Sequence, residues 1–162
     1  MQMTDKTFNR LSELGIQLPA AVAPVANFVA VTFDGSTAYV SGQIPIANGE
    51  LLHPGTLGAN VSVEQGQEAA RLAVINVLSQ LSHALGGGLD RVTKCLRLGV
   101  FVAATPDFKD HPKVANGASD LVVEVFEERG RHARAAVGVA SLPFGVSVEV
   151  DGVFQVSPAI PS

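Results

Sequence analysis

The sequence has little of several residue types that particular classes of protein need. It contains one cysteine, Cys95, no tryptophan and one tyrosine, and its 11 Lys and Arg are outnumbered by 15 Asp and Glu. A single cysteine cannot form an internal disulfide, which favours a reducing compartment, and we therefore expect a cytoplasmic protein. The net charge of −4 disfavours nucleic acid as a partner, because binding to phosphates depends on Lys and Arg.

Long apolar segments and metal-ligand spacings are missing as well. The polar first 19 residues lack the basic start and apolar run of a signal peptide. No stretch approaches the roughly 18 consecutive apolar residues of a membrane-spanning helix, so we expect no contact with a membrane. The spacing of the histidines predicts no metal site. They are His53, His83, His111 and His132.

What is present predicts one domain. A chain of 162 residues is long enough to bury one substantial core, and we treat residues 1–162 as a single domain with an N-terminal helical extension over residues 1–20. Apolar residues make up 47% of the chain and charged residues only 16%. Such a thin surface charge indicates an oligomer, in which part of the apolar surface is covered.

Hydrophobic periodicity predicts an α+β fold in the order ββ, α, β, α, ββ after a short opening helix. The two main helices are expected on one face of a mixed β-sheet, and a neighbouring subunit could cover the other face. Ser62 and Gln65 form a capping box that begins the first main helix. We expect helices over residues 4–15, 62–85 and from 106 to about 126, strands over 27–33, 37–41, 93–103, 133–141 and 145–156, and a loop over 46–60.

Arg134 is the most informative charged residue, because it stands in a strand otherwise built of alanine, valine and glycine. An arginine among small apolar residues needs an anionic partner, and its planar guanidinium suits a carboxylate. One interpretation is a site for a small carboxylate-bearing metabolite. The alternative is an internal salt bridge to Glu149 or Asp151 on an adjacent strand, and the spacing alone favours neither.

Two further groups of residues are candidates for the site. Glu149 and Asp151 are two residues apart, so both leave the same face of the final strand, where they could transfer protons or simply be solvated. At the end of an earlier strand, Ser41 and Gly42 could approach a ligand closely, with Gln43 beside them, although Ser-Gly also commonly marks a turn.

Several segments together resemble the YjgF/Rid family, also described as L-PSP-type endoribonucleases. They are the hairpin ending Val-Ser-Gly-Gln-Ile-Pro at residues 40–45, the helix around residues 69–85, the strand end at 100–102, Ala-Arg-Ala-Ala-Val at 133–137, Leu-Pro at 142–143 and Val-Glu-Val-Asp at 148–151. The resemblance runs from about residue 23 to residue 154. Residues 114–134 resemble a less studied branch of this family.

The resemblance implies a chorismate-mutase-like fold, a homotrimer with clefts at the subunit interfaces, and hydrolysis of reactive enamines or imines to 2-keto acids and ammonia without a cofactor. It also implies roles for individual residues. Arg134 would bind the substrate carboxylate, Asp151 would hold the attacking water, Ser41 and Gly42 would line the cleft, and Asn116 would form a polar wall.

Three positions depart from the family pattern. Val25 stands where deaminating members have tyrosine, Ala136 where many have cysteine, and Asp151 where the acid is usually glutamate. The sequence therefore leaves three functions open: an enamine or imine deaminase, a non-catalytic trimeric protein that binds a small carboxylate, and, third, an endoribonuclease or translation inhibitor, which the acidic composition disfavours.

Overall fold

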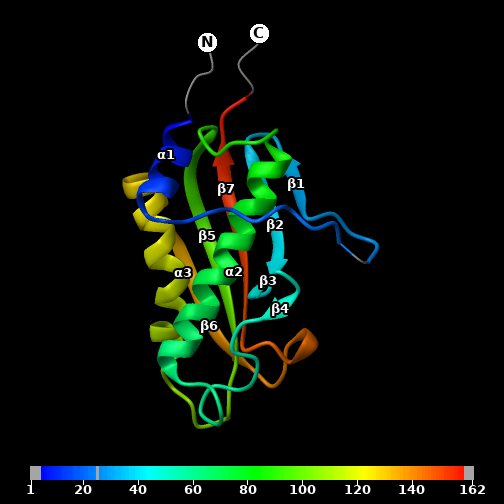
Figure 1. Ribbon diagram of the computed structural model, residues 1–162, viewed down its shortest axis with the longest axis vertical. Helices are drawn as coiled ribbons and strands as arrows, with labels where there is room; N and C mark the ends of the chain where they lie inside the picture. Colours follow the sequence, from blue (N-terminus) through cyan, green and yellow to red (C-terminus); the bar gives the residue numbers. More distant parts are fainter. Residues whose placement is uncertain (1–4, 25, 159–162) are drawn as a thin grey trace.

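A five-stranded mixed sheet carries the two long helices on one of its faces (Figure 1). The computed structural model describes residues 5–24 and 26–158. The strand order is β1-β2-β7-β5-β6, and all neighbours are antiparallel except β5 and β6, which run parallel. The α+β class expected from the sequence, with a mixed sheet and two main helices on one of its faces, is confirmed. The elements are α1 (Lys6–Glu13), β1 (Val31–Asp34), β2 (Thr37–Gln43), β3 (Ile46–Ala47), β4 (Glu50–Leu51), α2 (Val63–Ala84), β5 (Val92–Ala103), α3 (His111–Phe126), β6 (Ala133–Val139) and β7 (Val148–Val156).

The core lies between the sheet and helices α2 and α3. The apolar faces predicted for these two helices are buried, apart from Leu85, which is partly exposed. They pack on the side chains of β5 and β7 that point toward the helices. The core is rich in valine and alanine, which pack closely between a sheet and helices. Its central members include Val74, Val77, Leu78, Leu81, Leu98, Val100, Val114, Leu121, Val122, Val148, Val150 and Phe154.

Helices α2 and α3 approach each other closely at two glycines. A Cβ at Gly117 would collide with the backbone of Gln67, and one at Gly66 would come within 3.1 Å of the side chains of Leu57 and Val114. At Gly117 only a residue without a side chain allows this approach, and at Gly66 a side chain would crowd its neighbours. It fixes the position of α3, which carries Asn116 and Ser119.

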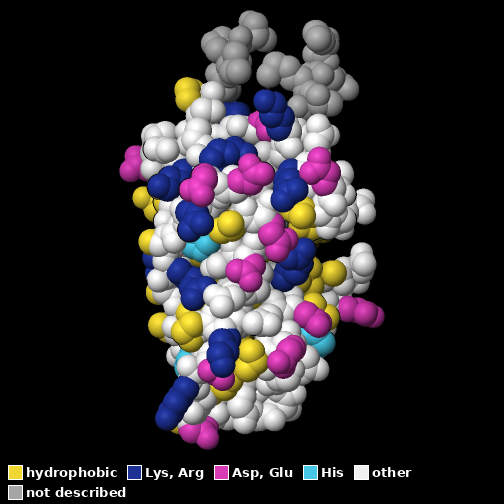
Figure 2. Space-filling view, turned by 90° about the vertical axis from the view of Figure 1, so that its left-hand side faces the viewer, with side chains coloured by type: hydrophobic (Ala, Val, Ile, Leu, Met, Phe, Trp, Pro, Cys, Tyr) yellow, Lys and Arg dark blue, Asp and Glu magenta, His cyan; other side chains and the backbone are white. Residues whose placement is uncertain are grey.

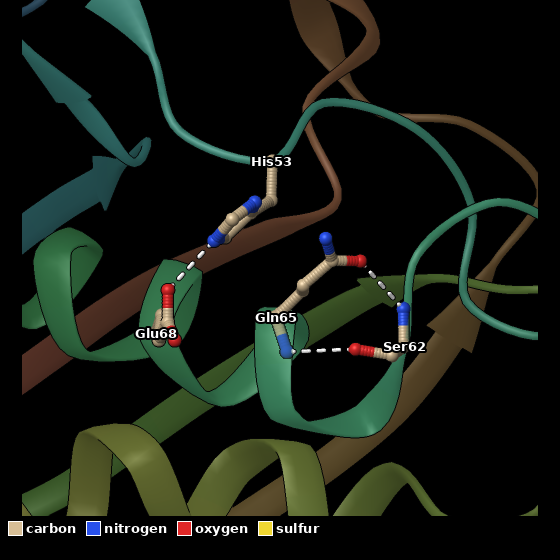
Figure 3. Close-up of polar contacts among 4 residues, drawn as sticks. All are labelled: His53, Ser62, Gln65 and Glu68. Atoms are coloured by element: carbon tan, nitrogen blue, oxygen red, sulfur yellow. Dashed lines mark hydrogen bonds and ion pairs between the residues drawn. The ribbon is translucent and has the colours of Figure 1, made fainter.

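The capping box predicted at the start of α2 is present (Figure 3). Gln65 N donates to Ser62 Oγ over 3.1 Å, and Ser62 N donates to Gln65 Oε1 over 3.0 Å. One turn further along the helix, Glu68 Oε2 lies 2.7 Å from His53 Nε2, which ties the preceding loop to α2. His53 has a positive φ of 49°, an uncommon conformation for a residue with a side chain, and this contact holds it in place.

Two aspartates attach the N-terminal helix to the turn before β5: Asp5 at the start of α1 accepts N–H groups of that turn, and Asp90 of the turn accepts N–H groups of α1. Asp5 Oδ1 accepts the N–H groups of Thr7 and Phe8 at 2.9 and 3.0 Å, and Asp5 Oδ2 accepts that of Leu89 at 2.8 Å. Asp90 in return accepts the N–H of Lys6 and the N–H and hydroxyl of Thr7 at 3.0 to 3.1 Å. The predicted start of this helix, Thr4, lies outside the described residues.

A segment between α1 and β1, residues 19–24, crosses over α2 (Figure 1) and is called the strap below. Ser79 Oγ donates to Pro19 O over 2.5 Å, and Gln80 Nε2 donates to Val22 O over 2.8 Å. The two polar residues on α2 therefore hold the strap on the helix.

Several of the predicted boundaries were wrong. Helix α3 begins at His111, five residues after the expected start at residue 106. Residues 27–30 are not strand, since β1 pairs with β2 only over Val31–Asp34. Residues 46–60, predicted as a loop, contain the small hairpin of β3 and β4, whose turn residues Asn48 and Gly49 have φ values of 53° and 77°. Strand β7 begins three residues later than expected, after a 3₁₀ turn over residues 143–145.

One residue of the final strand segment was also misplaced. Strict alternation along the expected strand 145–156 would place Ser147 on the outward face with Glu149 and Asp151, but Ser147 is fully buried. It precedes β7, and its carbonyl accepts the N–H of Ala103 at the end of β5. Within the described part of the chain, no helix is long and apolar enough to cross a membrane.

Candidate functional site

Arg134 lies on the edge strand β6 with its side chain on the helix side of the sheet. It pairs with Leu98 of β5, a core residue under the helices. Its Nη1 donates to Asn116 Oδ1 over 2.8 Å and to Ser119 Oγ over 3.1 Å, and its Nη2 lies 3.5 Å from Pro112 O. Pro112, Asn116 and Ser119 follow one another at helical spacing, so one face of α3 holds the guanidinium.

The internal salt bridge considered for Arg134 does not form. Strand β5 lies between β6 and β7, and the side chains of Glu149 and Asp151 leave the opposite face of the sheet. Among the described residues, no Asp or Glu forms an ion pair with Arg134. Its contacts are an amide oxygen, a hydroxyl and a carbonyl, all of them uncharged, so its positive charge is uncompensated within this part of the chain.

A chain of hydrogen bonds extends from Arg134 to His132. His132 Nδ1 lies 2.6 Å from the carbonyl of Gly130, which can only accept, so Nδ1 carries the proton in the neutral ring. His132 Nε2 must then accept from Ser119 Oγ, 2.8 Å away. The Ser119 hydrogen is thereby directed away from Arg134, and its oxygen is free to accept from the guanidinium.

An open pocket of about 260 Å³ is lined by Ser119, His132 and Arg134, together with Val123 and Arg131. Both hydrogens of Arg134 Nη1 are used by Asn116 and Ser119. Among the described residues, Arg134 Nε has no hydrogen-bond partner and Nη2 has only the distant carbonyl of Pro112. This edge of the guanidinium can therefore bind an anion such as a carboxylate through two oxygens.

Ala136 lies two residues after Arg134 on the same face of β6 and is partly buried against the core. Its methyl group can neither donate nor accept a hydrogen bond. Beside Arg134 it offers a small apolar surface and no nucleophile.

The two acids of β7 lie on the open face of the sheet, and each rests over a glycine of a neighbouring strand. A Cβ at Gly42 of β2 would overlap the carboxylate of Glu149, and a Cβ at Gly99 of β5 would overlap that of Asp151. The glycines thus provide the space into which the two side chains lean, one to each side of β7. The carboxylates point away from each other along the sheet.

The electrostatic settings of the two acids differ. Burial, and secondly the charge of Asp151, raise the pKa of Glu149 above its ordinary value, so Glu149 retains a proton at higher pH than a solvated glutamate. Asp151 Oδ1 lies 3.8 Å from Nη1 of Arg97, yet this oxygen is buried and has no hydrogen-bond partner among the described residues. The Asp151 side chain as a whole is 37% exposed, so a ligand or a water molecule can reach the carboxylate from the open face.

The predicted segment Ser41-Gly42-Gln43 is divided by the β-bulge. Ser41 Oγ donates to Val29 O over 2.8 Å, which ties it to the segment before β1, and Gly42 lies beneath Glu149. Gln43 pairs with Val150, a core residue, and lines a different pocket on the helix side of the sheet. Only Gly42 of this segment therefore contacts a carboxylate of the acid pair.

The candidate residues thus form two groups on opposite faces of one sheet. Arg134, Asn116 and Ala136 are together on the helix side, and Gly42, Glu149 and Asp151 are on the open side. Three contributors were missed from the sequence, namely Ser119, His132 and Arg97. The position of His132 two residues before Arg134 was a signal for the first group, because alternate residues of an extended chain share a face.

Other possibilities for chemistry are limited in the part of the chain that the structure describes. No group of three or more His, Cys, Asp or Glu side chains there could hold a metal ion. Cys95 is buried, and burial raises the pKa of its thiol to about 12, so it remains protonated and unreactive. On the side of the molecule where α1 and α3 lie, Lys and Arg are interspersed with Asp and Glu, without a continuous basic surface (Figure 2).

Residues 8–151 match the model of the family described as "YjgF/chorismate mutase-like, putative endoribonuclease". Among individual proteins, the chain is 50% identical over 148 residues to protein TCP17 of Trypanosoma cruzi, which covers 91% of this chain and 92% of that protein.

Solved structures show the same fold. Atu1372 from Agrobacterium tumefaciens, a protein of unknown function, has a TM-score of 0.88 and 44% identity, over 93% of this chain and 92% of that one. A "putative endoribonuclease" from Shewanella oneidensis has a TM-score of 0.89 and 35% identity, over 93% and 99%. TdcF from E. coli, with bound serine, has a TM-score of 0.59 and 25% identity, over 85% and 94%.

Proposed function

The chain belongs to the YjgF/chorismate-mutase-like family, and on that premise we propose that it hydrolyses small enamine or imine intermediates to 2-keto acids and ammonia. Arg134 binds the substrate carboxylate. The observation that carries this proposal is the setting of Arg134, which uncharged acceptors hold in place without neutralising its charge. An arginine that is prepared in this way binds a carboxylate with little reorganisation.

The bound serine of TdcF supports the same class of ligand, since an amino acid carries a carboxylate next to a carbon–nitrogen bond. A 2-imino acid has the same two groups. The Arg134 pocket, at about 260 Å³, suits a compact substrate of this kind.

The acid comes from a neighbouring subunit of a homotrimer whose clefts lie at the subunit interfaces. Arg134 and the acids of β7 leave opposite faces of the sheet, so one chain cannot direct both at one small molecule. The open face also exposes Tyr39 by 45% and Val137 by 46%, which supports its covering by a second copy. In the assembled site, Arg134 with Asn116 and Ala136 faces Glu149, Asp151, Ser41 and Gly42 of the neighbour.

The reaction needs one water and one proton relay. Water attacks the imine carbon, a C–O bond forms, and the second electron pair of the C=N bond moves to nitrogen, while a carboxylate takes a proton from the attacking water and passes it to nitrogen. The hydroxyl of this adduct then gives up its own proton, which the same relay delivers to nitrogen. The C–N bond breaks, the carbonyl forms, and ammonia leaves. Asp151 is the acid that the family resemblance indicates for holding the water, and its side chain is 37% exposed on the open face, where a water can reach the carboxylate. Glu149, with its raised pKa, can carry the proton to nitrogen.

The test measures ammonia released from a 2-imino acid that an amino acid oxidase generates in the same cuvette. The wild-type protein should accelerate the release, and Arg134→Ala should lose this acceleration. Arg71→Ala is the matched control, because this substitution removes the same charge at a different place. Arg71 lies on α2 and pairs with Glu124 of α3 over 3.7 Å. Equal rates for the wild type and Arg134→Ala would refute the enzymatic proposal.

A second candidate function is binding without turnover. Two features favour it, namely Ala136, which offers no reactive group, and the pairing of Asp151 with Arg97, which reduces its freedom to act as a base. In that case 2-keto acids would raise the thermal unfolding temperature of the wild type but not of Arg134→Ala, and ammonia release would equal that of the buffer.

An endoribonuclease is the function that the family description names, but the charges of this chain do not favour it. The net charge of −4 gives little attraction for a polyanion. We therefore rank it third.

A further inference from the structure

A second pocket lies on the helix side of the sheet, between the strap and the β3–β4 hairpin. Its volume is about 420 Å³, within the usual range of small-molecule sites. Helix α2 forms one wall with Asn76, Ser79 and Gln80, which share a face at positions i, i+3 and i+4. The strap and the hairpin form the remaining walls, and Gln43 of β2 lines it as well.

The hydrogen bonds of this wall fix which way each amide points. Asn76 Nδ2 donates to Ile44 O over 2.8 Å and to Ile46 O over 3.0 Å. Gln80 Nε2 donates to Val22 O over 2.8 Å, and Gln43 Nε2 to Ser41 O over 3.2 Å. The atom that faces a carbonyl oxygen must be the nitrogen, so the three amides cannot be flipped. Ser79 likewise uses its hydrogen on Pro19 O.

The amide nitrogens of this wall are used as donors, whereas the amide oxygens remain free to accept. Among the described residues, no donor reaches the side-chain oxygens of Asn76, Gln80 or Gln43. Asn76 is only 7% exposed and Gln80 only 8%, so their surroundings and their hydrogen bonds hold the two amides in fixed orientations. A ligand that brings N–H groups to these oxygens would form hydrogen bonds without reorganising the wall.

The rest of the lining decides the class of ligand. The pocket is otherwise lined by Pro19, Ala20, Val22, Ile46, Ala47, Asn48 and Gly49. No charged side chain is among the described residues that line it, so neither an anion nor a cation would find a counter-charge there. An uncharged head with several N–H groups, joined to a short apolar body, matches both features.

We propose that this pocket is a binding site for a small neutral molecule with an N–H-rich head of the primary carboxamide or urea type. The head donates to the amide oxygens of Asn76, Gln80 and Gln43, and the apolar body packs against the strap and the hairpin. The site is distinct from the Arg134 pocket, and it does not depend on the function proposed above.

The test uses benzamide as the probe and N,N-dimethylbenzamide as the matched ligand, which has the same ring and carbonyl but no N–H. Nitrogen-15-labelled wild-type protein is titrated with each, and the side-chain NH₂ signals of Asn76 and Gln80 are followed by NMR. Benzamide should shift these signals saturably. The dimethyl compound should bind about tenfold more weakly, as expected when hydrogen bonds worth about 1.4 kcal/mol in total are lost.

A substitution at Gln43 tests whether benzamide binds at this wall, and it leaves the hydrogen bonds that hold the strap intact. Gln43→Met removes one acceptor and keeps the side-chain length, and should weaken benzamide roughly three- to tenfold. Gln17→Met, at an exposed position outside this pocket, should leave the affinity unchanged. Equal affinity for the two ligands, shifts that do not saturate, or an unchanged affinity in Gln43→Met would each overturn the proposal.

Discussion

Arg134 and Asp151 lie on opposite faces of the sheet, and each is paired with one of two consecutive residues of β5. Arg134 is in register with Leu98, and Asp151 with Gly99, the next residue along that strand. Adjacent residues of a strand point to opposite faces, so this relationship is built into the register. A small molecule can therefore contact both groups only if they come from two copies of the chain.

A shared site predicts complementation between inactive variants. Arg134→Ala should be inactive, and so should a chain with Glu149→Gln and Asp151→Asn, but their mixed oligomers should recover some ammonia release. In a random one-to-one mixture of a closed ring, about a quarter of the sites have both functional halves. The measurement is the rate after the two proteins are unfolded together and refolded. Separately refolded and then briefly mixed samples are the control, and a rate that stays at zero in the co-refolded sample would argue against a shared site.

Ser119 is expected to position Arg134. Ser119→Ala removes one acceptor from Nη1 and breaks the link to His132, so the guanidinium becomes less ordered. We expect KM for the imino acid to rise about three- to tenfold, from the loss of one hydrogen bond to a charged group, with a smaller change in kcat. Ser119→Thr retains the hydroxyl and should restore most of the affinity. If alanine and threonine behave alike, the hydroxyl has no such role.

The raised pKa of Glu149 predicts the sign of a pH effect on stability. A carboxyl whose pKa is higher in the folded state binds more protons when folded, so its contribution to the free energy of unfolding falls as pH rises from the ordinary carboxyl range through the raised value. Glu149→Gln should therefore stabilise the protein at pH 7 relative to the wild type, with the difference vanishing near pH 4. Urea unfolding at several pH values measures it. A destabilised Glu149→Gln at pH 7 would contradict the prediction.

Asp90 should have the opposite dependence. Burial raises its pKa, but hydrogen bonds with Asp5, Thr7 and Lys6 outweigh this and lower the pKa overall. Its contribution to stability is therefore present above the ordinary carboxyl range and is lost as pH falls through the lowered value. Asp90 accepts through both carboxylate oxygens, whereas an amide accepts through one, so Asp90→Asn should destabilise the protein by about 1 kcal/mol at neutral pH, as for the loss of one hydrogen bond, and flatten the acid side of its stability profile. Asp120→Asn, on the exposed side of α3, is the control.

The parts of the fold that could be predicted are those that local chemistry determines. The 3.6-residue period of α2 and α3, the capping box of Ser62 and Gln65, and the alternation in β7 gave the elements and their order. The β3–β4 hairpin was missed although Asn48-Gly49 is a strong turn signal, because the surrounding glycine and proline obscured two very short strands.

The partners of Arg134 could not be predicted from spacing, because they depend on strand order. A sequence in which β6 is followed directly by β7 suggests that the two strands are neighbours, yet β5 lies between them. The close packing at Gly66 and Gly117 then places α3 beside Arg134, so that Asn116 and Ser119 reach the guanidinium. Both facts belong to the tertiary structure, and neither has a local signature.

The charge of Arg134, which no acid among the described residues neutralises, has a practical consequence for purification and assays of the protein. A guanidinium with a free edge binds phosphate, sulfate, citrate or acetate by the same contacts that it offers a substrate. Purification and assay buffers that contain these ions would compete for the pocket and raise the apparent KM. Measurements in an uncharged or zwitterionic buffer with chloride as the only anion, repeated with added sulfate, would separate the intrinsic affinity from this competition.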